Sequence, residues 1–141
     1  MKKDIKNYDE LNKEYEIGLL EDDEFLSRNI RKKIAEKIEY IVNNILPIIQ
    51  PENDIANLHE VSFFEDKERQ ELVELYKKLM YYYRYSCRLN LEDSDKENEN
   101  FIQEAHSGLK NLKPSLKNYF DKLKDTWKKD SKKLDDAGYF G

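Results

Sequence analysis

A stripe of aliphatic residues spaced three or four positions apart constrains this chain more than any other feature. Its members are Leu26, Ile30, Ile34, Ile38, Ile41 and Ile45. Such spacing places side chains along one face of an α-helix, whereas a β-strand alternates at every second position. The stripe predicts a helix that opens at the acidic run of residues 21–24 and ends near Leu46 or shortly after Pro47. The end is expected there because proline lacks the N–H that an interior helical residue donates.

Three other segments show the same helical spacing. Residues 5–19 predict a short first helix, and residues 62–90 predict a third helix that begins with Ser62 and Glu65 as a capping box. Residues 101–127 predict a fourth helix with a kink or a split between Gly108 and Pro114. Between the second and third helices, residues 50–61 show no period and predict a long loop with room for one helical turn.

The composition agrees with a helical fold. Charged residues make up 39% of the chain and apolar residues 38%, so the polar excess must lie on one side of amphipathic helices. A chain of 141 residues suits one domain. We therefore expect an all-α, single-domain, up-and-down bundle of about four helices over residues 1–128, the last kinked near Gly108 to Pro114, followed by a frayed polar tail, residues 129–141.

The end of that tail, residues 135–141, contains two acidic and two aromatic residues, Asp135, Asp136, Tyr139 and Phe140. The aromatic pair leaves three interpretations open, because such side chains can enter a partner's groove, fold back onto the bundle or stay frayed.

Neither a membrane span nor a signal peptide is expected. The longest uncharged stretch, residues 40–51, contains Asn43, Asn44 and Pro47 and is shorter than the roughly 18 apolar residues of a membrane helix. Acidic residues follow the N-terminal lysines where a signal peptide would need an apolar core. We expect a cytoplasmic protein with no membrane partner. Cys87 is the one cysteine, so it forms no internal disulfide, and we expect it to be buried and inert.

No recognisable catalytic, metal-binding or cofactor motif occurs in the sequence. Glu104 and His106 are two residues apart, which on a helix turns their side chains about 200° from each other. One cysteine cannot complete a zinc pattern, and the scattered glycines form no phosphate-binding loop. We therefore predict no metal and no cofactor. An enzyme whose site is assembled from dispersed carboxylates and tyrosines stays open, and a cleft that gathers several titratable groups would be its signature.

An aromatic and cationic helix face is the strongest candidate site. It comprises Lys77, Tyr81, Arg84, Tyr85 and Arg88, which fall within an arc of about 100° on a helix. Three interpretations stay open. Tyr and Arg are enriched at protein interfaces; guanidinium groups and tyrosine rings can bind phosphates and stack bases; or the rings could pack on neighbouring helices while the arginines pair with acids.

A second basic stripe would form along the fourth helix. It comprises Lys110, Lys113, Lys117, Lys124 and Lys128, which would lie within about 60° of one another. Asp121 and Asp125 border the stripe, and the whole chain has a formal net charge of −5. The stripe is either a solvated face or a phosphate-binding surface, and nucleic-acid binders are normally basic.

The sequence favours a non-enzymatic binding or assembly protein that presents the Tyr/Arg face to a protein partner. The alternative is a small RNA- or DNA-binding subunit of a larger complex. A homo-oligomer is also open, because amphipathic helices close a core within one chain or across a dimer with the same pattern. A tyrosine assigned to solvent could then lie in a dimer seam.

Overall fold

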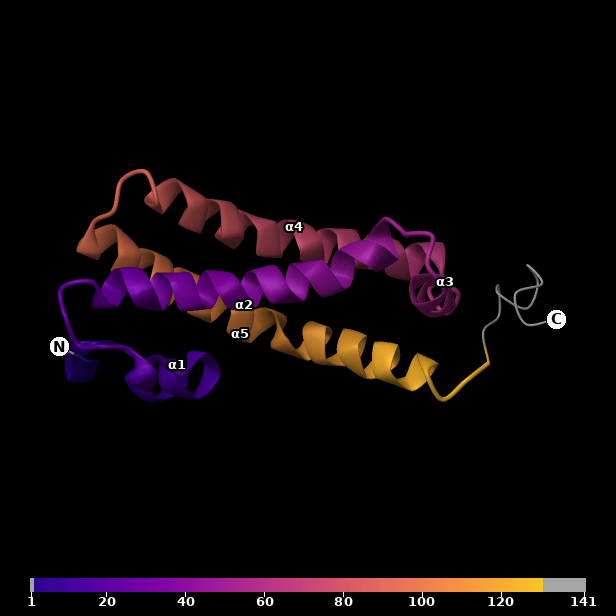
Figure 1. Cartoon of the computed structure of the whole chain (residues 1–141), viewed down its shortest axis with the longest axis horizontal. Helices are drawn as coiled ribbons and strands as arrows, with labels where there is room; N and C mark the ends of the chain where they lie inside the picture. Colours follow the sequence, from indigo (N-terminus) through magenta and orange to yellow (C-terminus); the bar gives the residue numbers. More distant parts are fainter. Residues whose placement is uncertain (1, 131–141) are drawn as a thin grey trace. The chain divides into compact units, whose positions relative to one another are not determined.

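The computed structural model describes residues 2–130. All the regular secondary structure in that range is helical (Figure 1). The α-helices are α1 (Tyr8–Tyr15), α2 (Leu26–Ile49), α3 (Ile55–Val61), α4 (Asp66–Leu89) and α5 (Asp95–Thr126). Short 3-10 helices at Lys2–Asp4 and Ile17–Leu19 flank α1. The predicted all-α class is confirmed. The five α-helices exceed the expected four by α3, a minor difference. None of the described helices is long and apolar enough to cross a membrane.

Two compact units divide the chain. The first comprises Met1–Ile41 and Leu79–Asn111, and the second comprises Val42–Lys78 and Leu112–Gly141. Each unit therefore contains part of α2, α4 and α5, while α1 belongs to the first and α3 to the second. The predicted tail falls almost wholly on residues 131–141, which lie outside the described residues, so its three interpretations stay open.

The aliphatic stripe of α2 supplies the core of the first unit, as predicted. Ile30, Ile34 and Ile38 are fully buried. Side chains from α4 and α5 complete this core because their apolar residues recur at the same helical spacing. They are Leu79, Leu89, Phe101, Ile102 and Ala105. Cys87 was expected to be buried, but it is half-buried, because it lies at the edge of the apolar face of α4.

A buried arginine joins three parts of the first unit. Arg31 on α2 is 1% exposed. Its Nε donates to Oδ1 of Asn98 on α5 at 2.8 Å, and its Nη1 donates to the carbonyl and the hydroxyl of Ser86 on α4 at 3.0 Å each. The carboxylate of Asp93, between α4 and α5, lies 3.7 Å from the guanidinium. These bonds fix α4 and α5 in one register, because a shifted helix would leave buried donors unpaired.

In the second unit, α3 occupies much of the segment predicted as a loop. Its first turn is capped by Asp54, whose Oδ1 accepts from the backbone N–H of Asn57 at 2.8 Å. The side chain of Asn57 in turn donates to the carbonyl of Pro47 at 3.0 Å. Arg69 of α4 donates to the carbonyls of Ile48 and Ile49, also at 3.0 Å. These side chains satisfy the last carbonyls of α2, which therefore continues to Ile49, just beyond Pro47.

The capping box predicted at Ser62 and Glu65 is wrong. Ser62 still belongs to the end of α3, where its hydroxyl donates to the carbonyl of His59 at 2.6 Å. One turn later, the backbone N–H of Glu65 donates to Oε1 of Glu68 at 3.1 Å. The third predicted helix therefore begins at Asp66, about one turn later than expected.

Helix α5 runs without a break through Gly108 and Pro114, so the predicted split does not occur. Pro114 is exposed, and its ring removes a single helical hydrogen bond. Gly108 is tolerated for a packing reason, because the ring of Tyr82 lies where a β-carbon would be. The predicted kink stays a prediction.

Candidate functional site

Four of the five residues predicted to form the Tyr/Arg face line one shallow groove of the first unit, with a volume of about 810 Å³. We call it the Tyr/Arg groove, and its lining residues are Met80, Tyr81, Arg84, Tyr85, Arg88 and Leu89 of α4 with Glu97 and Glu104 of α5. Lys77 is not among them. Its ammonium lies 3.3 Å from the carboxylate of Glu74 instead. The predicted cluster therefore begins at Tyr81.

The tyrosines of the groove are anchored from below and open to solvent above. The ring of Tyr85 packs edge-on against the fully buried ring of Phe101, with centroids 5.1 Å apart. Tyr81 contacts Tyr85 in the same manner at 6.1 Å and is 55% exposed. The exposed ring is therefore held in place by its neighbours before any partner arrives, which reduces the entropy lost on binding.

Both tyrosines of the groove stay protonated. The hydroxyl of Tyr81 donates to Oε1 of Glu104 at 3.0 Å, and this bond, together with the negative charge of Glu104, raises the pKa of Tyr81. Burial raises the pKa of Tyr85; the carboxylates of Glu104 and Glu97 raise it further, while Arg88 opposes the shift. Neither phenol ionises near neutral pH, so the rings act as contact surfaces rather than as bases.

The two arginines differ in their partners. Arg88 lies 3.4 Å from Glu92 one turn later, in a pair whose side chains are both largely exposed. Such a surface pair contributes little stability and gives way readily to another carboxylate. Arg84 forms no ion pair within residues 2–130, and its guanidinium lies 5.5 Å from the ring centroid of Tyr83. The donors of Arg84 are therefore available to an anionic group.

The acidic wall of the groove was not found by sequence reasoning. Glu97 and Glu104 are seven residues apart and flank Phe101 at steps of four and three, so α5 presents them on the face that meets α4. That spacing was a usable signal. Its meaning depends on which residues of α4 lie opposite, and only the tertiary structure gives that register. The groove consequently has a cationic wall and an anionic wall.

The predicted lysine stripe is diluted by acids. Lys110 lies 3.3 Å from Glu10, and Lys124 lies 3.6 Å from Asp125. The side chains of Lys113, Lys117 and Lys128 are exposed. Each unit therefore has an acidic residue next to a lysine of the stripe. These acids weaken the interpretation that the stripe binds phosphates.

The two histidines make separate contacts. His106 is buried beside the ring of Tyr15, and its Nε2 lies 2.9 Å from Oε2 of Glu10. His59 is buried in the second unit, where its Nε2 lies 2.8 Å from the carbonyl of Thr126 and its ring packs on Trp127. These contacts lie at the C-terminal end of α5, which ends at Thr126. Within residues 2–130, no group of three or more His, Cys, Asp or Glu side chains is placed to hold a metal ion.

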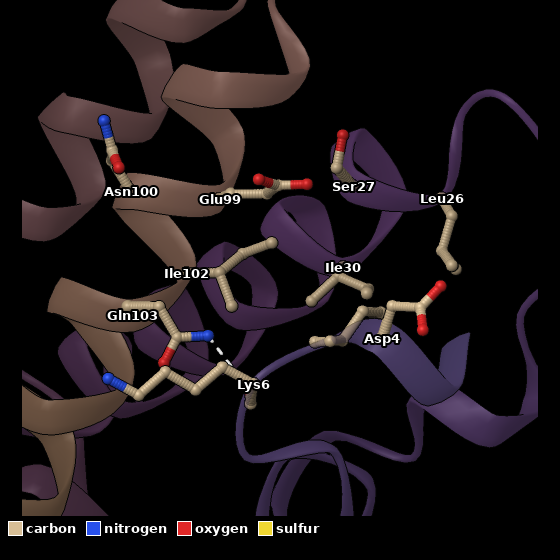
Figure 2. Close-up of a pocket in the computed structure, with 10 residues that line it drawn as sticks. Asp4, Lys6, Leu26, Ser27, Ile30, Glu99, Asn100, Ile102 and Gln103 are labelled. Carbon is tan, nitrogen blue, oxygen red and sulfur yellow. Dashed lines mark hydrogen bonds between the residues drawn. The ribbon is translucent and has the colours of Figure 1, made fainter. Parts of the chain in front are cut away.

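A smaller pocket of about 310 Å³ lies elsewhere in the first unit, between the N-terminal segment, α2 and α5. Figure 2 shows the aliphatic side chains of Ile30 and Ile102 in this pocket, together with the carboxylates of Asp4 and Glu99. The amide of Gln103 donates to the carbonyl of Lys6 at 3.0 Å and closes one side. Its volume is at the lower end for small-molecule sites.

Comparison with protein-family models, with curated proteins and with solved structures finds no match to this chain.

Proposed function

We propose that this chain is a non-enzymatic binding or assembly protein whose Tyr/Arg groove receives a protein partner. The observation that carries the proposal is the pairing of an exposed, pre-positioned tyrosine with an arginine that has no ion pair in the described residues. Tyr81 offers a rigid aromatic surface, and Arg84 offers donors beside it. Tyrosine and arginine with an apolar floor are the composition typical of interface hot spots.

The floor of the groove adds to this argument. Tyr81 and Tyr85 line the groove between the arginines of α4 and the acids of α5, so a partner would cover aromatic surface at the centre and meet charges at the rim. Protein interfaces have this anatomy of an apolar core and a polar rim. A cytoplasmic location is part of the same proposal, and imaging of the tagged protein would test it.

The alternative partner is a nucleic acid, and the groove supports it less. Phosphate binding would use Arg84 and Arg88, but Glu97 and Glu104 line the same groove and repel phosphates. A protein partner can present charges of both signs, whereas a nucleic-acid backbone presents one.

Site-specific photo-crosslinking tests the protein-binding role directly. A photoreactive phenylalanine analogue is placed at position 81 and, as a matched control, at Tyr40, which is 66% exposed on α2 and does not line the groove. We expect a discrete protein adduct from position 81 alone, and its loss when Arg84→Glu/Arg88→Glu is added. Equal labelling from both positions, or none from position 81, would contradict the proposal. Circular dichroism confirms that each variant is folded.

A further inference from the structure

The two walls of the Tyr/Arg groove carry opposite charges, and these charges lie at similar positions along the groove. The bond between Tyr81 and Glu104 and the ring contact between Tyr85 and Phe101 fix α4 and α5 side by side in antiparallel register. Moving one more turn along both helices brings Arg88 level with Glu97. The cationic wall, Arg84 and Arg88, and the anionic wall, Glu97 and Glu104, therefore run along the same stretch of groove.

We propose that the partner of this groove is a second copy of the same chain, docked face to face about a two-fold axis parallel to the groove. This inference rests on the proposed protein-binding role of the groove. Rotation by 180° about such an axis sets the cationic wall of one copy against the anionic wall of the other. It leaves the position of each residue along the groove unchanged. Arg88 of one copy then meets the anionic wall of the other at Glu97, and Arg84 reaches toward Glu104. The same pairs form twice, as an isologous interface requires.

The charge pattern selects this axis over the other face-to-face arrangement. A two-fold axis perpendicular to the groove would set the arginines of one copy against those of the other, and like charges in contact across an interface oppose association. The parallel axis also brings together the exposed rings of Tyr81 from the two copies. Those rings would form the centre of the interface, with charges at its rim.

Charge-swap complementation tests the pairing. One variant carries Arg84→Glu/Arg88→Glu, and the other carries Glu97→Lys/Glu104→Lys. Each alone sets like charges against each other on both sides of the interface. Mixed in equal amounts, the two variants restore opposite charges on both sides. Lys117→Glu/Lys128→Glu is the matched control, because it reverses two exposed charges that do not line the groove.

Sedimentation velocity on the full chain, from about 1 to about 200 µM, measures the outcome because dimers follow mass action. We expect a dimer for the unaltered chain and for the control. Each groove variant should dimerise on the order of a hundredfold more weakly, and the mixture should regain the dimer. A chain that is monomeric throughout, a groove variant that dimerises normally, or a mixture that stays monomeric would each overturn the inference.

Two further measurements keep these outcomes clear. The thermal midpoint of each variant shows whether it is folded. If charge reversal unfolds the chain, Gln replaces the same residues in each pair. The mixture of these two Gln variants retains charged contacts on one of the two sides of the interface. The crosslinking result separates the two proposals. A position 81 adduct of another mass, with a monomeric chain, overturns self-association and leaves the protein-binding role standing; no adduct at all ends both.

Discussion

The Nε of Arg31 donates a 2.8 Å hydrogen bond to Oδ1 of Asn98, and both side chains are buried. This bond is part of the set that holds α4 and α5 in the register on which the Tyr/Arg groove depends. We expect Arg31→Ala to lower the free energy of unfolding by about 3 to 5 kcal/mol, because it strips buried polar groups of their partner. Urea unfolding followed by circular dichroism measures the change.

Arg28 supplies the control for that experiment. Its guanidinium pairs with Asp93 at 2.6 Å, but the side chain is partly exposed. Arg28→Ala should therefore lower the free energy of unfolding much less than Arg31→Ala does. Similar losses for both arginines would show that burial of Arg31 has no special effect.

Acid should weaken the same region through Asp93. Hydrogen bonds from Arg28 and Asn98 hold the pKa of its carboxyl below the usual 3.8. A carboxyl whose pKa is lower in the folded state adds stability that is complete above its unfolded pKa and is lost as pH falls below it. Stability measured by urea titration should thus decline from about pH 4 downward. In Asp93→Asn the decline over this window should be shallower, and an identical pH profile would contradict the assignment.

Gly108 should be required by the ring of Tyr82. A β-carbon at position 108 would come 2.7 Å from Cε2 of that ring and closer still to its hydroxyl end. We expect Gly108→Ala to lower the free energy of unfolding by about 1 to 3 kcal/mol, as overpacking does. In a Tyr82→Ala background the sign should reverse, because alanine is about 1 kcal/mol better than glycine inside a helix. Thermal unfolding of the four chains measures both effects, and stabilisation in the unaltered background would refute the packing role.

The helical fold could be predicted because the buried face of each long helix appears in the sequence as apolar residues three or four positions apart. Ile30, Ile34 and Ile38 are buried as their spacing predicts. Helix α3 was missed because it is short, and because the contacts that support it come from Asn57 and Arg69 acting on the end of α2. Such tertiary capping leaves no periodic signal in the sequence. The split expected in α5 failed for a similar reason, since the space left by Gly108 is filled by Tyr82 from another helix.

The part of the candidate site that lies on α4 could be predicted from the sequence, whereas the part on α5 could not. Tyr81, Arg84, Tyr85 and Arg88 share one helix, so their common face follows from helical geometry alone. The acidic wall depends on the pairing of α4 with α5, and that register is set by Arg31, a residue that sequence periodicity does not mark as buried. A local period assigns faces to one helix, but it does not reveal which faces meet.

Nucleic-acid binding provides the last discriminating measurement. Labelled single-stranded RNA and duplex DNA should show no binding at about 200 mM salt and little at about 50 mM, because acids line the Tyr/Arg groove and the chain carries a net charge of −5. Fluorescence anisotropy measures both conditions. Glu97→Gln/Glu104→Gln serves as the control, since removing the acidic wall should strengthen any residual binding. Tight binding by the unaltered chain that collapses at the higher salt and disappears in Arg84→Glu/Arg88→Glu would assign the groove to phosphates, because protein docking on its apolar floor would depend far less on salt.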